Sequence, residues 1–200
     1  MSKFKITILI FFYLINSAIA KTVENKKFTY TVFIGRFQPF HDGHLKVVES
    51  ALQVSEKIII LCGSANKPRS FKNPLTFSER KELISKVLED NYNNRYFIEA
   101  LDDYESDDDW RNSVLNSVKK IAGKGKTRVA LIGHQKDASS YYLSLFPEWR
   151  YLEVENYQGI NATDIRKLIS QNKIDEVKHF LPPQAHEFIP LIKKYVGEFN

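Results

Sequence analysis

The sequence predicts an α/β fold, a doubly wound parallel sheet with further helices at the C-terminal end. Strand-like runs alternate along the chain with longer runs of helical periodicity, which is the order expected when crossover helices connect parallel strands. The chain has 200 residues and 43% hydrophobic content, enough for one domain with a sizeable core. No linker divides residues 21–200, so we expect a single domain there.

The first half of this domain is expected to contain three strands and three helices. The runs rich in β-branched and apolar residues cover residues 28–34, 57–61 and 95–101. The runs with apolar residues at helical spacing cover residues 43–54, 76–90 and 107–122. The second helix opens with Thr76-Phe77-Ser78-Glu79, a capping box in which the end side chains accept from each other's backbone N–H groups.

The second half continues the alternation and then becomes helical. Strands are expected at residues 128–132 and 150–154, with a helix around residues 139–145 between them. Two or three helices follow, from Asp164, from about Ile174 and from residue 183 to 196. Because ligands of a doubly wound sheet bind at the carboxyl ends of its strands, functional residues are expected in the loops after the strands.

The first twenty residues differ from the rest. Lys3 and Lys5 give a basic start, residues 6–15 are almost wholly apolar, and Ala18-Ile19-Ala20 forms an A-x-A site. This layout predicts a secretory signal peptide, and the apolar run is short for a membrane span. The alternatives are a mistaken start site or an N-terminal helix packed on the domain or a partner. Membrane contact is expected only through this segment, if it is retained.

The charge balance favours a small anionic ligand over nucleic acid. The net charge is +5, and without Lys3 and Lys5 there remain 27 basic against 24 acidic residues, a net +3. This excess is modest and spread along the chain, so it suits an anionic substrate, although ordinary surface lysines also explain it. The lone Cys62 lies in an apolar run and is expected in the core.

Residues 34–45 read Ile-Gly-Arg-Phe-Gln-Pro-Phe-His-Asp-Gly-His-Leu and join the first strand to the first helix. Gly35 removes a Cβ where a large ligand must approach the backbone. The helix that begins near Gly43 directs its N–H groups and positive dipole end at the same space, which favours anions. His41 and His44 are three positions apart, so both imidazoles can face one phosphate. The segment predicts a site that holds a nucleoside triphosphate by its phosphates.

This segment also carries a family resemblance. Its H-x-G-H pattern is the signature of the nucleotidyltransferase superfamily, and the string G-R-F-Q-P-F-H-x-G-H resembles nicotinamide mononucleotide adenylyltransferases of the archaeal and bifunctional bacterial type. The resemblance spans residues 29–181. It implies a Rossmann-like nucleotidyltransferase fold and transfer of AMP from ATP to nicotinamide mononucleotide, which forms NAD and pyrophosphate. The side chains that it implies for catalysis are His41, His44, Arg36 and Arg166.

A second motif, Gly159-Ile160-Asn161-Ala162-Thr163-Asp164-Ile165-Arg166, is expected at a helix start. Thr163 and Arg166 can converge there on phosphates with backbone N–H groups. The motif resembles the superfamily's I-S-S-T-x-I-R but has Asn161 and Ala162 in place of the two serines. The resemblance therefore does not imply one of the family's hydroxyl contacts here, while Asn161 can still cap or donate. A capped amphipathic helix is the alternative. The ATP site that the resemblance implies comprises Gly35, Arg36, Phe37, Gln38, Gly43, His44, Gly133, His134, Asn161, Thr163 and Arg166.

The run Gly133-His134-Gln135-Lys136-Asp137 ends a strand and is similar to a glycine segment in the family's nucleotide pocket. The resemblance implies that His134 or Lys136 contacts the nucleotide; a lysine exposed in a loop is the alternative reading of Lys136.

Four residues are expected near the second substrate. The segments Gly63-Ser64-Ala65-Asn66 and Asn73–Arg80 are similar to the family's substrate pocket, which implies that Ser64, Asn73 and Arg80 bind or organise it. The alternative for Arg80 is a surface ion pair. Trp110 offers a plane for stacking on a cationic nicotinamide ring. The alternative is core packing, because Val114 and Val118 continue its face of the helix. The aspartates at 107–109 are expected to be a solvated helix start.

No H-E-x-x-H, EF-hand or Cys/His cluster occurs in the sequence, so we expect no metal chelated by the protein and Mg²⁺ carried by ATP. The alternative enzymes are related transferases that use nicotinic acid mononucleotide, pantetheine phosphate or a cytidylyl donor. Family members that use either of the last two usually lack the string R-F-Q-P-F before H-x-G-H. A nucleotide-sensing module is an alternative of another class. The chain leaves no room for a fused regulatory domain and keeps both histidines, which favours catalysis.

A third class, a secreted or tethered interaction protein, is motivated only by residues 1–20. Use of ATP favours the cytoplasm, so that segment and the site motifs predict different compartments. The expected partners are the small molecules ATP and nicotinamide mononucleotide, without nucleic acid. The sequence is compatible with a homo-oligomer and does not fix the oligomeric state.

Overall fold

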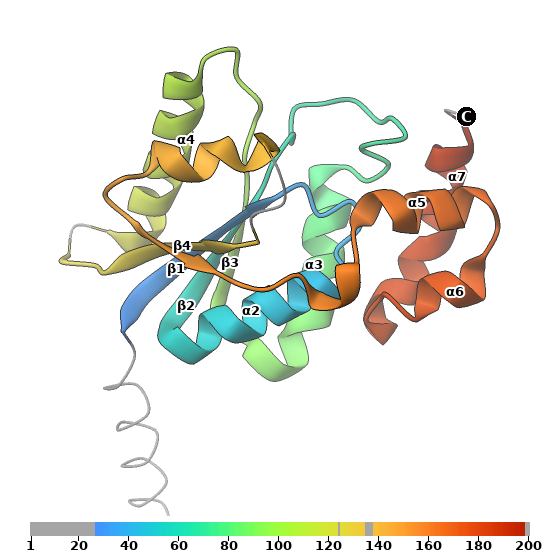
Figure 1. Cartoon of the computed structure of the whole chain (residues 1–200), viewed down its shortest axis with the longest axis horizontal. Helices are drawn as coiled ribbons and strands as arrows, with labels where there is room; N and C mark the ends of the chain where they lie inside the picture. Colours follow the sequence, from blue (N-terminus) through green and yellow to red (C-terminus); the bar gives the residue numbers. More distant parts are fainter. Residues whose placement is uncertain (1–26, 124, 135–137, 199–200) are drawn as a thin grey trace, which may run out of the picture.

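The computed structural model describes residues 27–123, 125–134 and 138–198; the leader predicted for residues 1–20 lies outside them. Within the described residues, five parallel strands form one sheet in the order β3-β2-β1-β4-β5 (Figure 1). The strands are β1 (Phe28–Gly35), β2 (Ser55–Cys62), β3 (Tyr96–Ala100), β4 (Val129–Gly133) and β5 (Arg150–Glu153). Because strands are added on both sides of β1, the predicted doubly wound sheet is confirmed.

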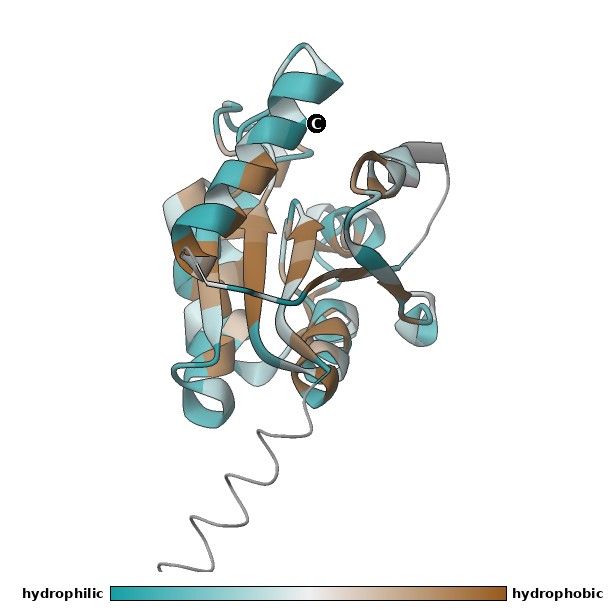
Figure 2. Cartoon of the chain, turned by 90° about the vertical axis from the view of Figure 1, so that its left-hand side faces the viewer, coloured by the Kyte–Doolittle hydropathy of each residue, from teal (hydrophilic) through white to brown (hydrophobic). Residues whose placement is uncertain are grey.

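Helices cover both faces of the sheet. Helices α2 (Asp42–Val54) and α3 (Phe77–Tyr92) pack on one face, whereas α4 (Asp107–Ala122) and the 3₁₀-helix η1 (Ala138–Leu145) lie on the other. Side chains alternate along each strand: in β1, Phe33 faces α2 and α3, while Val32 faces α4. Figure 2 shows the resulting hydrophobic strands enclosed between helices whose outer faces are hydrophilic.

The helix starts follow the local sequence. Thr76 caps α3: its backbone N–H donates to Oε2 of Glu79 at 2.7 Å, and its Oγ1 accepts from the Glu79 N–H at 3.4 Å, so the predicted capping box is confirmed. Ser106 caps α4 by accepting from the N–H of Asp109 at 3.0 Å. The three aspartates at 107–109 are exposed in the first turn of α4, as predicted.

The C-terminal part consists of the 3₁₀-helix η2 (Tyr157–Gly159), α5 (Ala162–Ser170), α6 (Ile174–Lys178), the 3₁₀-helix η3 (Pro183–Phe188) and α7 (Ile189–Glu198). The start predicted at Asp164 is wrong by two residues, because Asn161 is the N-cap and accepts from the Asp164 N–H at 3.0 Å. The single helix predicted for 183–196 is also wrong. It divides before Pro190, which has no N–H to bond to the preceding turn. The helix predicted around 139–145 is a 3₁₀-helix.

Of these, α5, α6, η3 and α7 gather at one end of the molecule, beside α3, whereas η2 lies against α2 (Figure 1). Ile165 and Ile169 of α5 and Ile192 of α7 continue the core that α2 and α3 form with the sheet. Cys62 is fully buried in the same core, as predicted, and burial raises the pKa of its thiol to about 12. In the part of the chain that the structure describes, no helix combines the length and apolar character needed to cross a membrane.

Candidate active site

A cavity of about 810 Å³ opens at the carboxyl ends of β1, β2 and β4, the edge where a doubly wound sheet binds ligands. It is also lined by the beginnings of α2, α4 and α5. The predicted site residues that line it are Gly35, Arg36, Phe37, Gln38, His41, Gly43, His44, Ser64, Trp110, Gly133, His134, Asn161, Thr163 and Arg166. Two predicted residues, Asn73 and Arg80, do not line it.

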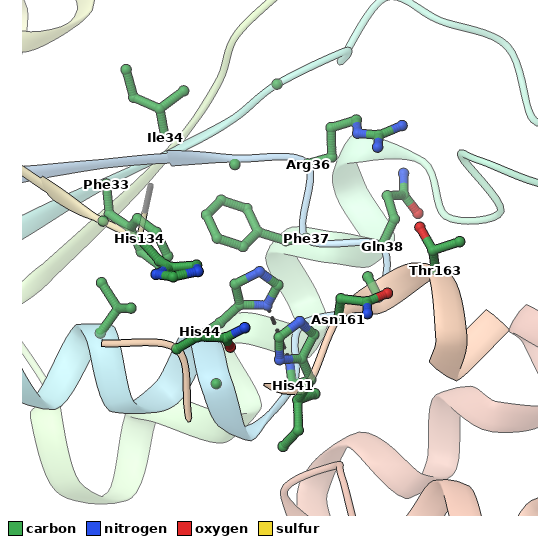
Figure 3. Close-up of a pocket in the computed structure, with 18 of the residues that line it drawn as sticks. Phe33, Ile34, Arg36, Phe37, Gln38, His41, His44, His134, Asn161 and Thr163 are labelled. Atoms are coloured by element: carbon green, nitrogen blue, oxygen red, sulfur yellow. Dashed lines mark hydrogen bonds between the residues drawn. The ribbon is translucent and has the colours of Figure 1, made fainter. Parts of the chain in front are cut away.

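The two histidines of the H-x-G-H motif lie against each other at the start of α2 (Figure 3). His41 is the N-cap residue and is 3% exposed, and the two rings stack with centroids 3.7 Å apart. The backbone N–H of His41 donates to Nδ1 of His44 at 3.3 Å. Since a backbone N–H can only donate, Nδ1 of His44 must accept. The neutral His44 imidazole therefore carries its proton on Nε2 and offers a hydrogen-bond donor there.

The two glycines make room for the rings around them. A Cβ on Gly43 would lie 3.1 Å from the His41 ring, and a Cβ on Gly35 would lie 2.9 Å from the ring of Phe37. Sequence reasoning assigned the space at Gly35 to a ligand, whereas the structure fills it with Phe37. This residue has a φ of 52° and is 2% exposed. Its ring meets His44 edge-on at 4.9 Å, so Phe37 supports the histidine from behind.

Gln38 joins two loops. Its Nε2 donates to the carbonyl of Leu75 at 2.7 Å, and its Oε1 accepts from the Leu75 N–H at 2.9 Å. Gln38 is 1% exposed, so the geometry makes it a link between the β1–α2 loop and the loop before α3. Its backbone carbonyl accepts from Nη1 of Arg166 at 2.7 Å, which connects α5 to the same loop.

Arg166 places a buried positive charge beside the cavity. It is 2% exposed, and its Nη2 donates to Oγ1 of Thr163 at 3.1 Å. Burial, together with the positive charge of Arg36, lowers the pKa of Arg166 to about 10, so the guanidinium remains charged at neutral pH. Arg36 is exposed and lines the same cavity. The structure thus brings two imidazoles and two guanidinium groups together, with the N-termini of α2 and α5, around one space suited to phosphates.

Asn161 and His134 also line the cavity. Asn161 caps α5 and also donates through Nδ2 to Asp164 at 2.6 Å, so its amide acts within the helix start. Nδ1 of His134 lies 3.3 Å from the carbonyl of Val154. Because a carbonyl only accepts, Nδ1 carries the proton, and the neutral ring offers an acceptor at Nε2. Lys136, predicted as an alternative contact, lies outside the described residues.

Arg80 takes an organising position rather than a place in the cavity lining. It is 1% exposed, which makes the surface ion pair considered for it wrong. Its Nη1 donates to the carbonyls of Arg36 at 2.8 Å and Gly63 at 2.6 Å, so it ties together the carboxyl ends of β1 and β2. Asn73 lies in a turn, where its N–H donates to Oγ of Ser70 at 3.1 Å. Direct substrate contact, expected for Asn73 and Arg80, is not supported by this placement.

Trp110 fits both readings of its role. Its ring packs edge-on against Tyr142 with centroids 5.6 Å apart and lies 6.0 Å from Phe146, yet it also lines the cavity. Sequence reasoning missed Asp103, Tyr142 and Tyr157, which line the cavity too. Asp103 could have been found, because it lies two residues after the strand predicted at 95–101, where functional residues were expected. The two tyrosines lie in 3₁₀-helices, which leave no clear periodic pattern.

Comparisons with known proteins agree with this geometry. The cytidylyltransferase-like family pattern matches residues 32–168. The nicotinamide/nicotinic acid mononucleotide adenylyltransferase of Acinetobacter baylyi is 42% identical over 152 residues, which are 75% of this chain and 80% of that protein. The chain belongs to the nicotinamide-nucleotide adenylyltransferases of this family. Another member, from Thermococcus sibiricus, is 32% identical over 81% of this chain and 83% of its own length.

Among solved structures, this adenylyltransferase is similar to a bifunctional NMN adenylyltransferase/ADP ribose pyrophosphatase from Francisella tularensis, with a TM-score of 0.73 and 34% identity. The match covers 86% of this chain and 52% of the other, so the chain spans about half the length of the bifunctional enzyme. That structure holds AMP and a manganese ion. The match confirms the Rossmann-like nucleotidyltransferase fold.

Proposed function

We propose that this chain transfers AMP from ATP to nicotinamide mononucleotide and forms NAD and pyrophosphate. The observation that carries the proposal is the convergence of His41, His44 and Arg166 with two helix N-termini on one cavity. A volume of about 810 Å³ suits small-molecule substrates of this size. The names of the relatives from Acinetobacter baylyi and Thermococcus sibiricus support the same activity.

The reaction asks the protein for orientation and charge neutralisation. A phosphate oxygen of the mononucleotide attacks the α-phosphorus of ATP in line. A new P–O bond forms, the bond between the α-phosphorus and its bridging oxygen breaks, and pyrophosphate leaves with the electron pair. The attacking phosphate is already anionic, so no side chain needs to remove a proton. We assign to Nε2–H of His44 a hydrogen bond to a non-bridging α-phosphate oxygen, where charge must be balanced.

We place the leaving pyrophosphate at the start of α5. Thr163, the backbone N–H groups of α5 and the charged Arg166 meet there, and exposed Arg36 adds a second cation from the β1–α2 loop. Arg166 has five N–H groups, of which Nη1 and Nη2 each use one within the protein. One N–H on each of Nη1 and Nη2 is left by these bonds and is assigned here to phosphate oxygens, and the charge is retained at neutral pH because the lowered pKa is still about 10.

A divalent metal fits this site as a companion of ATP. Among the described residues, no group of three or more His, Cys, Asp or Glu side chains could hold a metal ion. The phosphate end of the cavity is lined by cationic and imidazole groups, which are poor ligands for a hard cation. We therefore propose that Mg²⁺ is held by the ATP phosphates and water, where it would supply further neutralisation of their charge.

The test is an assay of the full chain with ATP and both mononucleotides, amide and acid, offered separately and in competition. The proposal expects NAD and pyrophosphate in equal amounts from the amide. The relative from Acinetobacter baylyi is named for both substrates. Product from the acid as well would indicate that this chain has the same dual specificity. ATP binding without any dinucleotide product would instead support a nucleotide sensor.

The compartment depends on residues 1–20. Adenylyl transfer uses ATP, which favours the cytoplasm, whereas the basic and apolar start predicts export or tethering. N-terminal sequencing of the protein isolated from its native cells separates these proposals. A chain that begins at Lys21 has been processed as a secreted protein, and one that keeps its first residues has not.

A further inference from the structure

The cavity has a second end, away from the phosphate groups, that the proposed mechanism has not yet used. Ser64 follows β2, and Asp103 follows β3, two strands from β1 in the sheet order. Ser64 is thus one strand spacing, roughly 5 Å, from the β1–α2 loop and Asp103 two, roughly 10 Å, a span suitable for the sugar and base of a mononucleotide. Trp110, at the start of α4, completes this end.

Asp103 is held in place by its neighbours. Asn66 brackets its backbone: Nδ2 of Asn66 donates to the Asp103 carbonyl and Oδ1 accepts from the Asp103 N–H, both at 3.0 Å. Oγ of Ser64 donates to Oδ1 of Asp103 at 3.1 Å. A carboxylate accepts about four hydrogen bonds, so this contact leaves capacity for a ligand. Asp103 is half-buried, which reduces the screening of its charge by water.

Arg80 is the nearby cation, and its hydrogen bonds go to groups other than the Asp103 carboxylate. Burial lowers the pKa of Arg80, and the negative charges of Cys62, when ionised, and Asp103 oppose that shift. The Nη1 group of Arg80 is committed to the carbonyls of Arg36 and Gly63. Among the described residues no ion pair within 4 Å joins Arg80 to Asp103, so the carboxylate lines the cavity with Trp110 without a cation bound directly to it.

We propose that Asp103 selects the amide mononucleotide over the acid, an inference that rests on the proposed function. The two substrates share the ribose, the phosphate and the cationic pyridine ring, and they differ only in the ring substituent. A carboxamide has an N–H that can donate to Asp103. A carboxylate at the same place has no donor and meets a like charge, which costs binding free energy.

The experiment measures kcat/KM for nicotinamide mononucleotide and for nicotinic acid mononucleotide at saturating ATP, in the full chain and in three variants. Asp103→Asn removes the charge and keeps an acceptor for Ser64. It is expected to lower the amide-to-acid ratio at least about tenfold. Asp103→Glu retains the charge and should keep the preference for the amide. Asp102→Asn removes a neighbouring exposed charge outside the cavity lining and should leave the ratio unchanged.

The outcomes separate this inference from the proposed function. A wild-type chain that forms neither dinucleotide overturns the proposed function. If the wild type is active and Asp103→Asn has the same amide-to-acid ratio of kcat/KM, only the inference about Asp103 is overturned and the proposed function stands. If Asp103→Asn loses the same factor on both substrates, the carboxylate acts on the shared ribose, which also contradicts the inference. An equal shift of the ratio in Asp102→Asn would show a long-range field instead of a contact. Thermal melting of each variant confirms that it is folded.

Discussion

At the residue scale, the two histidines of the H-x-G-H motif differ in burial and in hydrogen bonding. His41 is nearly buried, and its ring fills the space that Gly43 leaves above the helix start. His44 is only partly buried and has its Nδ1 engaged by the His41 backbone. The hydrogen bond therefore fixes which nitrogen of His44 can donate, and Phe37 fixes the orientation of its ring.

Replacing His44 by alanine should lower kcat by a hundredfold or more, because it removes a donor aimed at the charge of the transition state. Steady-state kinetics with ATP and nicotinamide mononucleotide measure this loss. The matched control is His179→Ala, an exposed histidine outside the cavity, which should keep wild-type rates. Near-native turnover in a folded His44→Ala protein would remove His44 from the mechanism.

Replacing Trp110 by alanine tests whether its ring binds a substrate or only packs. If the indole stacks on the cationic pyridine ring, KM for nicotinamide mononucleotide should rise about tenfold, more than KM for ATP. Trp149→Ala is the control, because that indole packs on Phe146 without lining the cavity. Equal increases in the two KM values of Trp110→Ala would mean that the residue serves the core alone.

At the element scale, the site depends on cross-links between loops rather than on any single helix. Gln38 connects the β1–α2 loop to Leu75, and Arg166 connects α5 to Gln38. Arg80 of α3 reaches back to the ends of β1 and β2. The N-termini of α2 and α5 line one cavity because these bonds hold the loops between them in place, and this is the arrangement that the proposed triphosphate site requires.

Replacing Arg80 by methionine should destabilise the fold by about 3 kcal/mol, because two carbonyls lose their donor at a buried site. Urea unfolding, followed by circular dichroism, measures the change in the free energy of unfolding. Arg150→Met is the control at an exposed position on the edge strand and should change stability by less than about 0.5 kcal/mol. A stable Arg80→Met protein with normal kinetics would contradict the organising role.

At the scale of the whole molecule, the two faces of the sheet have separate tasks. One face carries α2, α3 and the C-terminal helices, of which α2 and α5 provide the helix starts proposed to bind phosphates; the other carries α4 and with it Trp110. The reversal of strand order at β1 opens the cavity between these two sets. Both substrates can then approach the same edge from opposite sides of the central strand.

A metal that arrives with the nucleotide should matter for turnover and not for the fold. Adding a chelator is expected to abolish NAD formation, and excess Mg²⁺ should restore it. The unfolding temperature of the nucleotide-free protein should be the same with and without the chelator, because the described residues include no cluster able to hold a metal. Elemental analysis that finds metal retained after dialysis, or a chelator-induced fall in that temperature, would count against this proposal.

The sequence by itself determined most of the elements and identified the segments from which a phosphate site is proposed. Alternation and periodicity placed the strands and the helices, and α4 was predicted with the bounds that the structure gives. The H-x-G-H segment indicated an anion site at a helix start. These features are encoded within a few neighbouring residues, as caps, glycines and apolar spacing, so a linear pattern is sufficient to find them.

Only the tertiary structure decided which loops meet. Arg80 is 44 residues from Arg36, and Gln38 is 37 residues from Leu75, so nothing local indicates that they bond. The position of Asp103 after a strand is visible in the sequence, but its hydrogen bond with Asn66, 37 residues away, is not. Hydrogen bonds between distant loops form only after the sheet has set their distance and direction, and a sequence pattern carries neither.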